Sequence, residues 1–158
     1  MSNTARGILA EFIVAKAPGI ADKLRLEWDA YDLLTSDGIK IEVKSAAYIQ
    51  SWFQKKPSTI AFGIQPARAW DNETNVLGTE PKRHADLYVF ALLAHKRQET
   101  IDPLNLDQWE FYVLPTSVLN EACPVQKKIS LSRVIGLGAT KTDYEGLAET
   151  IRARLMTG

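Results

Sequence analysis

The chain has 158 residues, of which 46% are hydrophobic and 24% charged, a composition typical of one soluble globular domain over residues 1–158. Its 19 basic and 19 acidic side chains balance, which argues against a tail-like basic DNA-binding protein and against an acidic disordered chain. A single cysteine, Cys123, excludes an intrachain disulfide and a multi-cysteine zinc site. Neither an apolar signal core nor a membrane-length apolar stretch occurs, so we expect a cytoplasmic protein that makes no contact with a membrane.

The neutral total conceals a basic middle region. Residues 40–97 contain nine basic and five acidic side chains, whereas the regions on either side each carry a net charge of −2. Basic side chains interleaved with aromatic ones are suited to phosphate contacts and base stacking. An ordinary solvated loop beside a few core aromatic residues would give the same pattern.

The first predicted elements are a helix and a hairpin. Apolar residues at helical spacing predict an amphipathic helix over residues 3–17, which Pro18-Gly19 ends. Residues 24–34 and residues 39–47 are predicted strands, and the polar turn at residues 35–38 joins them.

The central part of the chain is predicted to supply further strands. Residues 48–56 predict a short helix or an irregular crossing, and residues 59–64 a short strand. Residues 65–84 form a polar connection too long for a simple turn, and such loops often carry function. Residues 86–94 are nearly all apolar and predict a buried central strand, which the strand at residues 108–114 follows.

The C-terminal part adds mostly helices. Residues 115–122 predict a short helix, and residues 128–131 a last strand, after which Ser132 opens a helical turn. Thr142 and Glu145 fit a capping box for a helix that continues to the end of the chain. This order of elements predicts an α/β or α+β fold with a mixed central sheet flanked by helices.

Two registers are open to the predicted hairpin. A two-residue turn would place Leu33 opposite Glu42 and mix apolar with charged partners. A three-residue loop with Gly38 in the left-handed conformation is a common hairpin form, and it places Leu33 opposite Ile41 on a clean apolar face. The hydrophobic pattern favours this second register.

The favoured register brings two carboxylates together. Tyr31 would face Val43, Asp32 would face Glu42, and Lys44 would share the side of the two acids. Carboxylates that face each other on a sheet repel by up to about 1 kcal/mol. A divalent cation relieves this repulsion, because Mg²⁺ is commonly held by one or two carboxylates together with water and a phosphate. The alternative is a solvated strand face with an incidental Glu–Lys pair.

At these residues the sequence resembles the PD-(D/E)xK nuclease superfamily, whose members share the restriction-endonuclease-like fold. The core of that family is a helix with a glutamate and a hairpin with an aspartate on its first strand and Glu-x-Lys or Asp-x-Lys on its second. The corresponding residues here are Glu11, Asp32 and Glu42-Val43-Lys44. The resemblance covers roughly residues 5–94. Tyr31 stands where the name of the motif has proline, a departure that many members share.

The resemblance implies a role for each of these residues. Asp32 and Glu42 would ligate Mg²⁺ or Mn²⁺, with the backbone carbonyl of Val43 as a further ligand. Lys44 would orient or activate the attacking water and stabilise charge on the phosphate. Glu11 would bind through water or support a second metal ion. The implied reaction is metal-assisted hydrolysis of a phosphodiester bond.

Glu11 has a second indication in the helix pattern. Ile8, Phe12 and Ala15 form an apolar stripe, and Glu11 falls on or beside it. A carboxylate on a buried face is costly without a partner, which favours a functional role. An exposed glutamate at the boundary of the stripe is the alternative.

Substrate contacts are expected from side chains that follow the Glu-x-Lys strand. Ser45 would hydrogen-bond a phosphate or simply continue the strand, and Gln50 would contact a metal-bound water or the substrate, or lie on the surface as an ordinary amide. The basic candidates for substrate binding are Lys55, Lys56, Lys82 and Arg83.

The sequence therefore predicts a metal-dependent nuclease that acts on DNA rather than RNA, with Mg²⁺ or Mn²⁺ as its cofactor. The alternative is a catalytically inactive nuclease-fold protein that binds nucleic acid or a partner protein. A third interpretation is an unrelated α/β domain with a chance motif. The sequence leaves open whether the chain acts as a homodimer or with a partner protein.

Overall fold

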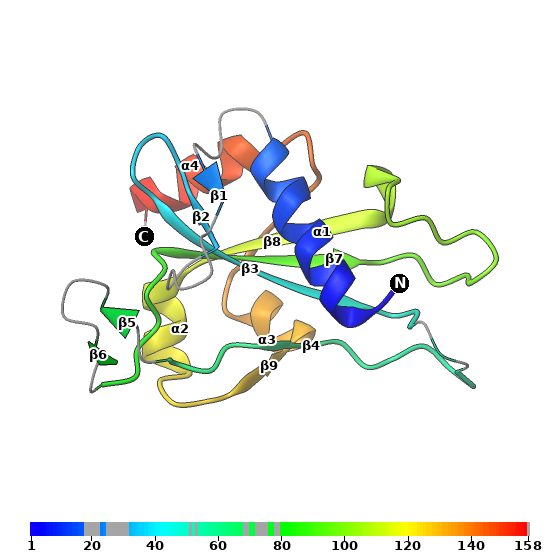
Figure 1. Ribbon diagram of the computed structural model, residues 1–158, viewed down its shortest axis with the longest axis horizontal. Coiled ribbons are helices and arrows are strands. Elements are labelled where there is room, and N and C mark those ends of the chain that lie inside the picture. Colours follow the sequence, from blue (N-terminus) through cyan, green and yellow to red (C-terminus); the bar gives the residue numbers. More distant parts are fainter. Residues whose placement is uncertain are drawn as a thin grey trace.

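The computed structural model describes residues 1–17, 23–24, 32–50, 52, 54–67, 70–71, 76–77 and 80–157. The chain has the expected α+β architecture, in which a mixed central sheet is flanked by helices (Figure 1). No helix in this described part is both long enough and apolar enough to cross a membrane.

Six strands of the described residues form the central sheet, in the order β1-β2-β3-β7-β8-β10. Their bounds are Lys23–Leu24 for β1, Leu33–Leu34 for β2, Lys40–Ala47 for β3, Leu87–Leu93 for β7, Trp109–Pro115 for β8 and Thr140–Thr142 for β10. The β3 and β7 strands run parallel, and the other neighbouring pairs are antiparallel.

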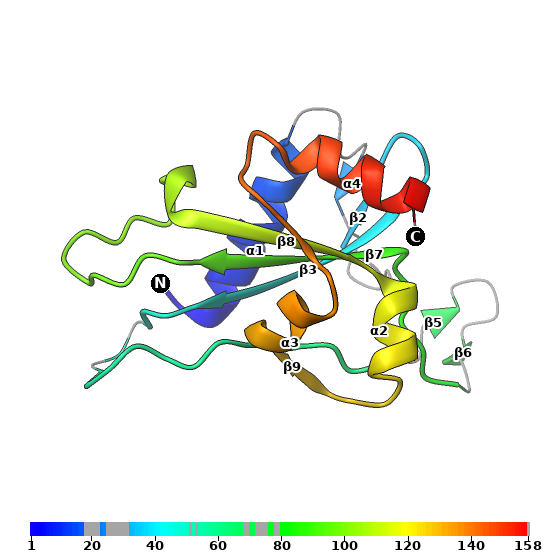
Figure 2. The same ribbon diagram turned by 180° about the vertical axis from the view of Figure 1, so that it is seen from behind.

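Different elements cover the two faces of this sheet. The helices α1 (Asn3–Lys16) and α4 (Leu147–Thr157) lie on one face, and α2 (Thr116–Ala122) and α3 (Leu131–Gly136) lie on the other (Figures 1 and 2). The smaller elements are β4 (Ala61–Gly63), which pairs with β9 (Lys128–Ser130), β5 (Trp70–Asp71), which pairs with β6 (Val76–Leu77), and the 3₁₀ turn η1 (Leu106–Gln108).

The β7 strand lies at the centre of the core, as its apolar sequence predicts. All seven of its residues are buried. Side chains alternate between the faces of a strand, so Val89 packs with the α1 and α4 residues, while Tyr88 and Phe90 pack on the opposite side with the α2 and α3 residues. The parallel neighbour β3 follows the same alternation.

The α1 helix has the predicted range but a different buried face. Its N-cap is Ser2, whose hydroxyl oxygen accepts a hydrogen bond from the backbone N–H of Ala5. Ile8 and Phe12 are 62% and 49% exposed, so the expectation that they form the buried stripe is wrong. The helix is apolar around most of its circumference, and the smaller Ala10 lies against the sheet instead.

The hairpin between β2 and β3 has the favoured register. Leu33 pairs with Ile41, and Thr35 bonds across a three-residue loop to Ile39 through its backbone N–H. Gly38 has a φ of 84°, the left-handed conformation that this loop requires and that glycine adopts without strain. The predicted pairing of Tyr31 with Val43 lies outside the described residues.

The predicted continuous strand at residues 24–34 is wrong. Instead, β1 and β2 are two short antiparallel strands, with Lys23 opposite Leu34 and Leu24 opposite Leu33. The rest of the predicted strand, residues 25–31, lies outside the described residues.

The capping box at Thr142 is also wrong, because Thr142 ends β10, a strand that the sequence pattern did not reveal, and the last helix starts at Leu147. The predicted opening of a helical turn at Ser132 is displaced as well, since Ser130 is the N-cap of α3. Local spacing alone did not distinguish a polar edge strand from a helix start.

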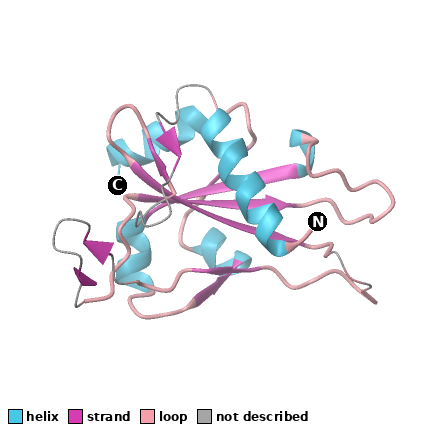
Figure 3. Ribbon diagram, viewed as in Figure 1, coloured by secondary structure: helices cyan, strands magenta, loops and turns pink. Residues whose placement is uncertain are grey.

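Loops after the central strands extend from one end of the sheet. The chain that follows β3 and the chain between β7 and β8 leave the sheet at the end where the N-terminus lies (Figure 3). At the opposite end of β3, its first residues meet β2. The two ends of β3 therefore have different surroundings.

Candidate active site and its surroundings

Asp32 is held at the point where β2 meets β3. Its side chain is buried, with 3% exposed, and its backbone N–H donates to the carbonyl of Ile41 at 3.0 Å. One carboxylate oxygen, Oδ2, accepts the backbone N–H of Val43 at 2.7 Å. Such a short bond to a carboxylate is charge-assisted. It fixes the acid against the middle of β3.

Glu42 and Lys44 lie on the same side of β3, two residues apart. Glu42 Oε1 is 3.1 Å from Lys44 Nζ, and their side chains are 18% and 33% exposed. An ion pair this accessible contributes little to folding stability. Both charged groups can be reached from solvent.

Tyr88 connects the two acids electrostatically. It is the parallel partner of Glu42 on β7 and is 4% exposed. Burial, together with the negative charges of Glu42 and Asp32, raises the pKa of its hydroxyl to about 12, and the positive charge of Arg83 opposes this rise. Both carboxylates therefore act on one buried hydroxyl group.

The donor set for a metal ion consists of two carboxylates. Among the described residues, no three histidine, cysteine, aspartate or glutamate side chains gather as a metal site. Asp32 and Glu42 do not form such a group with Glu11. Mg²⁺ can nevertheless be held by one or two carboxylates when water and substrate oxygens complete its coordination. The Asp32 and Glu42 carboxylates are thus the pair that could hold a metal ion.

Glu11 is half-buried on α1. The buried side of this helix packs against Ile41 and Val43, on the face of β3 opposite to that of Glu42. Its predicted role, through water or at a second metal ion, stays a prediction.

Ser45 and Gln50 join a polar cluster that the sequence did not predict. Its centre is Arg6 of α1, which is only 9% exposed. The guanidinium Nε donates to Ser45 Oγ at 3.5 Å, and Nη1 donates to Asn3 Oδ1 at 3.0 Å and to Gln50 Oε1 at 3.3 Å. Gln50 Nε2 donates in turn to the carbonyl of Ala47 at 2.9 Å. Both candidate residues are therefore half-buried partners of an arginine.

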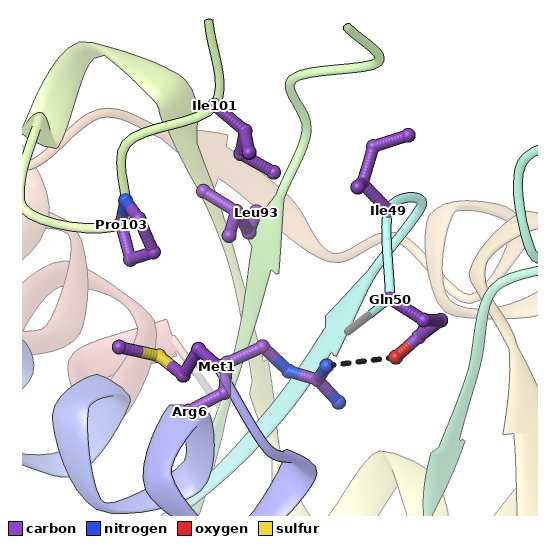
Figure 4. Close-up of a pocket in the computed structure, with 7 residues that line it drawn as sticks. All are labelled: Met1, Arg6, Ile49, Gln50, Leu93, Ile101 and Pro103. Atoms are coloured by element: carbon purple, nitrogen blue, oxygen red, sulfur yellow. Dashed lines mark hydrogen bonds between the residues drawn. The ribbon is translucent and has the colours of Figure 1, made fainter. Parts of the chain in front are cut away.

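This cluster borders a pocket of about 260 Å³ at the end of the sheet. Figure 4 shows Arg6 and Gln50 joined by their hydrogen bond on one side of it, with apolar side chains above. No sequence signal pointed to Arg6, because the predicted buried stripe of Ile8 and Phe12 lies on the other side of the helix. Its partners Ser45 and Gln50 also come from segments distant in the sequence.

Most of the predicted basic residues lie on the surface. Lys55, Lys56 and Lys82 are exposed, as a phosphate-binding role requires. They lie in the connections that follow β3 and precede β7.

Arg83 does not belong to this exposed set, although the sequence offers it as a candidate for substrate binding. It is 7% exposed, and its guanidinium donates to four acceptors inside the protein. The acceptors are the Ile64 carbonyl at 2.8 Å, Asn120 Oδ1 at 3.1 Å, the Cys123 carbonyl at 2.7 Å and the Gln126 carbonyl at 3.3 Å. Arg83 therefore holds the segment after β4 against the end of α2.

The comparisons with known proteins agree with a nuclease. Residues 1–133 match the family model described as bacteriophage T4 endonuclease IV. A comparison with curated proteins finds no match. The matched range covers most of the chain and contains both the hairpin with its two acids and the Arg6 cluster. The chain therefore belongs to the bacteriophage T4 endonuclease IV family, a family of nucleases.

Proposed function

We propose that the chain is a metal-dependent endonuclease of the PD-(D/E)xK type that hydrolyses phosphodiester bonds in DNA. The observation that carries this proposal is the hairpin register. It holds the buried carboxylate of Asp32 against β3 at Val43, between Glu42 and Lys44 in the sequence. Membership of an endonuclease family supports the same class of reaction.

The metal ion in this proposal is Mg²⁺ or Mn²⁺. Asp32 and Glu42 would hold it, together with the Val43 carbonyl, water and phosphate oxygens of the substrate. The two carboxylates fit such an ion because hard oxygen donors are what it prefers and because both act on the same neighbourhood around Tyr88. When bound, the ion polarises the phosphate and lowers the pKa of a coordinated water.

The residues of the chain have distinct tasks. Asp32 is immobilised by its bond to the Val43 N–H, so its second oxygen has a fixed direction. Lys44, paired with Glu42 and partly exposed, orients the attacking water and stabilises negative charge on the phosphate. Glu11 acts through water or supports a second metal ion. Lys55, Lys56 and Lys82 contact phosphates along the substrate strand, which makes binding weaker as the salt concentration rises.

Cleavage of closed circular DNA tests this proposal, because a circle has no ends and reports endonucleolytic cuts alone. With Mg²⁺ or Mn²⁺ the unmodified protein is expected to nick or linearise the circle, and a chelator is expected to stop it. Glu42→Ala and Lys44→Ala should each lose activity by about 100-fold or more, as for groups acting directly on the reacting atoms. An RNA circle should be cut more slowly than the DNA circle.

A second ion pair of the same sheet supplies the matched control. Lys141 Nζ lies 3.4 Å from Glu110 Oε1, on strands β10 and β8. Lys141→Ala and Glu110→Gln, which can keep an acceptor for the Tyr112 hydroxyl, break this surface pair on other strands and should leave cleavage within about twofold of the unmodified protein. Undiminished cleavage by Glu42→Ala and Lys44→Ala would overturn the assignment of the site.

A nuclease-fold protein that binds nucleic acid without cutting it is the second candidate. One observation favours it, since no three metal-ligating side chains gather among the described residues. A calorimetric titration with Mn²⁺ separates the two functions. Heat of binding that disappears in Asp32→Asn supports the nuclease, whereas DNA binding with no metal binding and no cleavage supports the inactive protein.

A further inference from the structure

The pocket beside Arg6 lies away from the two acids and has walls of a different kind. It is formed by the first turn of α1, the ends of β3 and β7, and the loop between β7 and β8. Its lining residues are Met1, Arg6, Ile49, Gln50, Leu93, Ile101 and Pro103. Five of these seven are apolar, so the walls can cover an apolar group, and the polar groups lie together on one side (Figure 4).

Arg6 brings a buried positive charge to this pocket. Its hydrogen bonds use Nε and Nη1, all to neutral acceptors, and within the described part of the chain Nη2 has no acceptor. No carboxylate of the described residues forms an ion pair with it either. Burial lowers the pKa of the guanidinium below its usual value, and no neighbouring charge offsets this effect.

Removing a cation from water costs free energy, and without a counter-ion the hydrogen bonds to neutral acceptors offset only part of this cost. An anion that reaches Nη2 would remove this imbalance, and phosphate suits a guanidinium fork especially well. The apolar walls beside it would cover a flat, weakly polar group. A nucleotide combines these two chemistries in one unit.

We propose that this pocket binds one nucleotide of the DNA strand, with its phosphate on Arg6 and its base between Ile49, Leu93 and Ile101. The inference rests on the proposed nuclease function and adds to it a binding site separate from the cleaved bond. The volume of about 260 Å³ lies just below the roughly 300 Å³ where pockets for drug-sized ligands begin. A single base fits this space, and a base pair does not.

The pocket and the cleaved bond are separated by the body of β3. Arg6 bonds to Ser45, which directly follows Lys44, and Gln50 lies beyond the end of β3. The side chains of Ser45 and Lys44 point to opposite faces of β3. The bound DNA strand therefore passes around the end of the sheet between the Arg6 pocket and the cleavage site.

Gln50 is a positioning residue in this arrangement. Its Oε1 accepts from Arg6 and its Nε2 donates to Ala47, so the amide holds the guanidinium in place. Its backbone N–H is fixed by Gln54 Oε1 at 2.7 Å.

An NMR titration of the isotope-labelled full chain tests the pocket without metal and without cleavage. The probes are a deoxynucleoside 5′-monophosphate, the matching deoxynucleoside and inorganic phosphate. We expect the monophosphate to shift the signals of the Arg6 Nε–H, the Gln50 side-chain amide and the Ile101 amide. It should bind at least tenfold more tightly than either of the other two probes.

Two variants and one control sharpen this test. Arg6→Met should weaken binding of the monophosphate at least tenfold, and Ile101→Ser, which leaves the guanidinium intact, should weaken it severalfold. Lys141→Met, an exposed cation on another strand, should leave it unchanged. The dispersion of the spectra shows whether each variant is folded.

The remaining outcomes overturn the proposal. Inorganic phosphate that binds as tightly as the monophosphate would show a plain anion site, and a nucleoside that binds as tightly would show that Arg6 takes no phosphate. Shifts that are absent, or that persist in Arg6→Met, would remove the pocket from nucleotide binding altogether. Failure of Glu42→Ala to affect cleavage would overturn the catalytic site while leaving the titration result standing, so the two proposals fail separately.

Discussion

Arg6 and Arg83 are both buried arginines, and they lie near opposite ends of β3. Arg83 lies near Tyr88, the partner of Glu42, and its guanidinium donates to three main-chain carbonyls and one side-chain amide. Arg6 lies near the other end of β3 and donates to one hydroxyl and two amide side chains. Among the described residues, its Nη2 has no acceptor.

The difference shows that burial of an arginine does not by itself indicate a binding site. What separates the two residues is the set of acceptors around each guanidinium. Carbonyl groups surround Arg83 and accept hydrogen bonds from its guanidinium inside the fold, so the role of Arg83 is structural. Arg6 lines a pocket, and its Nη2 has no acceptor among the described residues, which is the basis for the proposal that a ligand binds there.

The largest change in the free energy of unfolding is expected when a substitution removes the hydrogen-bond donors of Arg83. Arg83→Met leaves buried carbonyls without partners at about 1–3 kcal/mol each, so we expect the free energy of unfolding to fall by about 3 kcal/mol or more. Urea denaturation measures this loss. Lys82→Met is the control at the adjacent exposed position and should change stability by less than about 0.5 kcal/mol. Equal losses in the two variants would contradict the structural role.

Asp32 provides the acidic counterpart to this test. Asp32→Ala removes the charge-assisted bond to the Val43 N–H and should lower the free energy of unfolding by about 2 kcal/mol. Asp32→Asn can keep an acceptor oxygen there and should lose about half as much, while both variants lose metal binding. A stability curve for Asp32→Asn identical to that of Asp32→Ala would show that the hydrogen bond is not the stabilising contact.

The Tyr88 hydroxyl, which lies near Arg83, makes the stability of the protein depend on pH. Its pKa of about 12 in the folded protein lies above the ordinary value of 10.0, so the folded state favours the neutral hydroxyl. The resulting stability is fully present below pH 10 and is lost as the pH rises through 12. Tyr88→Phe should reduce this alkaline loss by about 1–2 kcal/mol, as measured by urea unfolding at a series of pH values. Superimposable pH profiles of the two proteins would rule out this contribution.

The smallest effect on stability is expected at Arg6. Arg6→Met gives up three hydrogen bonds but also removes a buried charge without a counter-ion, and these two contributions oppose each other. We expect a change in the free energy of unfolding within about 1 kcal/mol, measured in the same urea series. A loss as large as that of Arg83→Met would erase the distinction between the two arginines.

Much of the central fold follows from the sequence, because local patterns determine it. The apolar run of β7, the range of α1 and the β2–β3 register are all confirmed, and the register needed only the loop chemistry of Gly38 and the alternation of apolar residues. The position of Asp32 beside β3 follows directly from that register.

The wrong predictions arose where tertiary contacts override local preference. Leu24 and Leu33 were expected in one strand, but they pair with each other on two antiparallel strands, which no local signal indicated. Phe12 was expected in the core by its hydrophobicity, yet the sheet packs against smaller residues of α1 that allow a closer approach. The polar composition of β10 gave no strand signal, since it is an edge strand.

In the candidate site, too, some features follow from local sequence and others depend on tertiary contacts. Glu42 and Lys44 could be paired from their spacing on a strand, and the structure places them 3.1 Å apart. The burial of Arg83 and the Arg6 pocket could not be predicted, because each depends on segments dozens of residues apart in the chain. Composition reveals that a cation is present, but only the fold determines which acceptors surround it.

The three-residue loop that ends at Gly38 has a consequence for how this chain can vary. Because the loop length sets which residue of β2 faces which residue of β3, a single inserted or deleted residue would exchange the two sides of the hairpin and carry Asp32 away from Val43. Substitutions within the loop can be absorbed so long as position 38 tolerates a positive φ. The number of residues between Asp32 and Glu42 is therefore under stronger constraint than the identity of most of them.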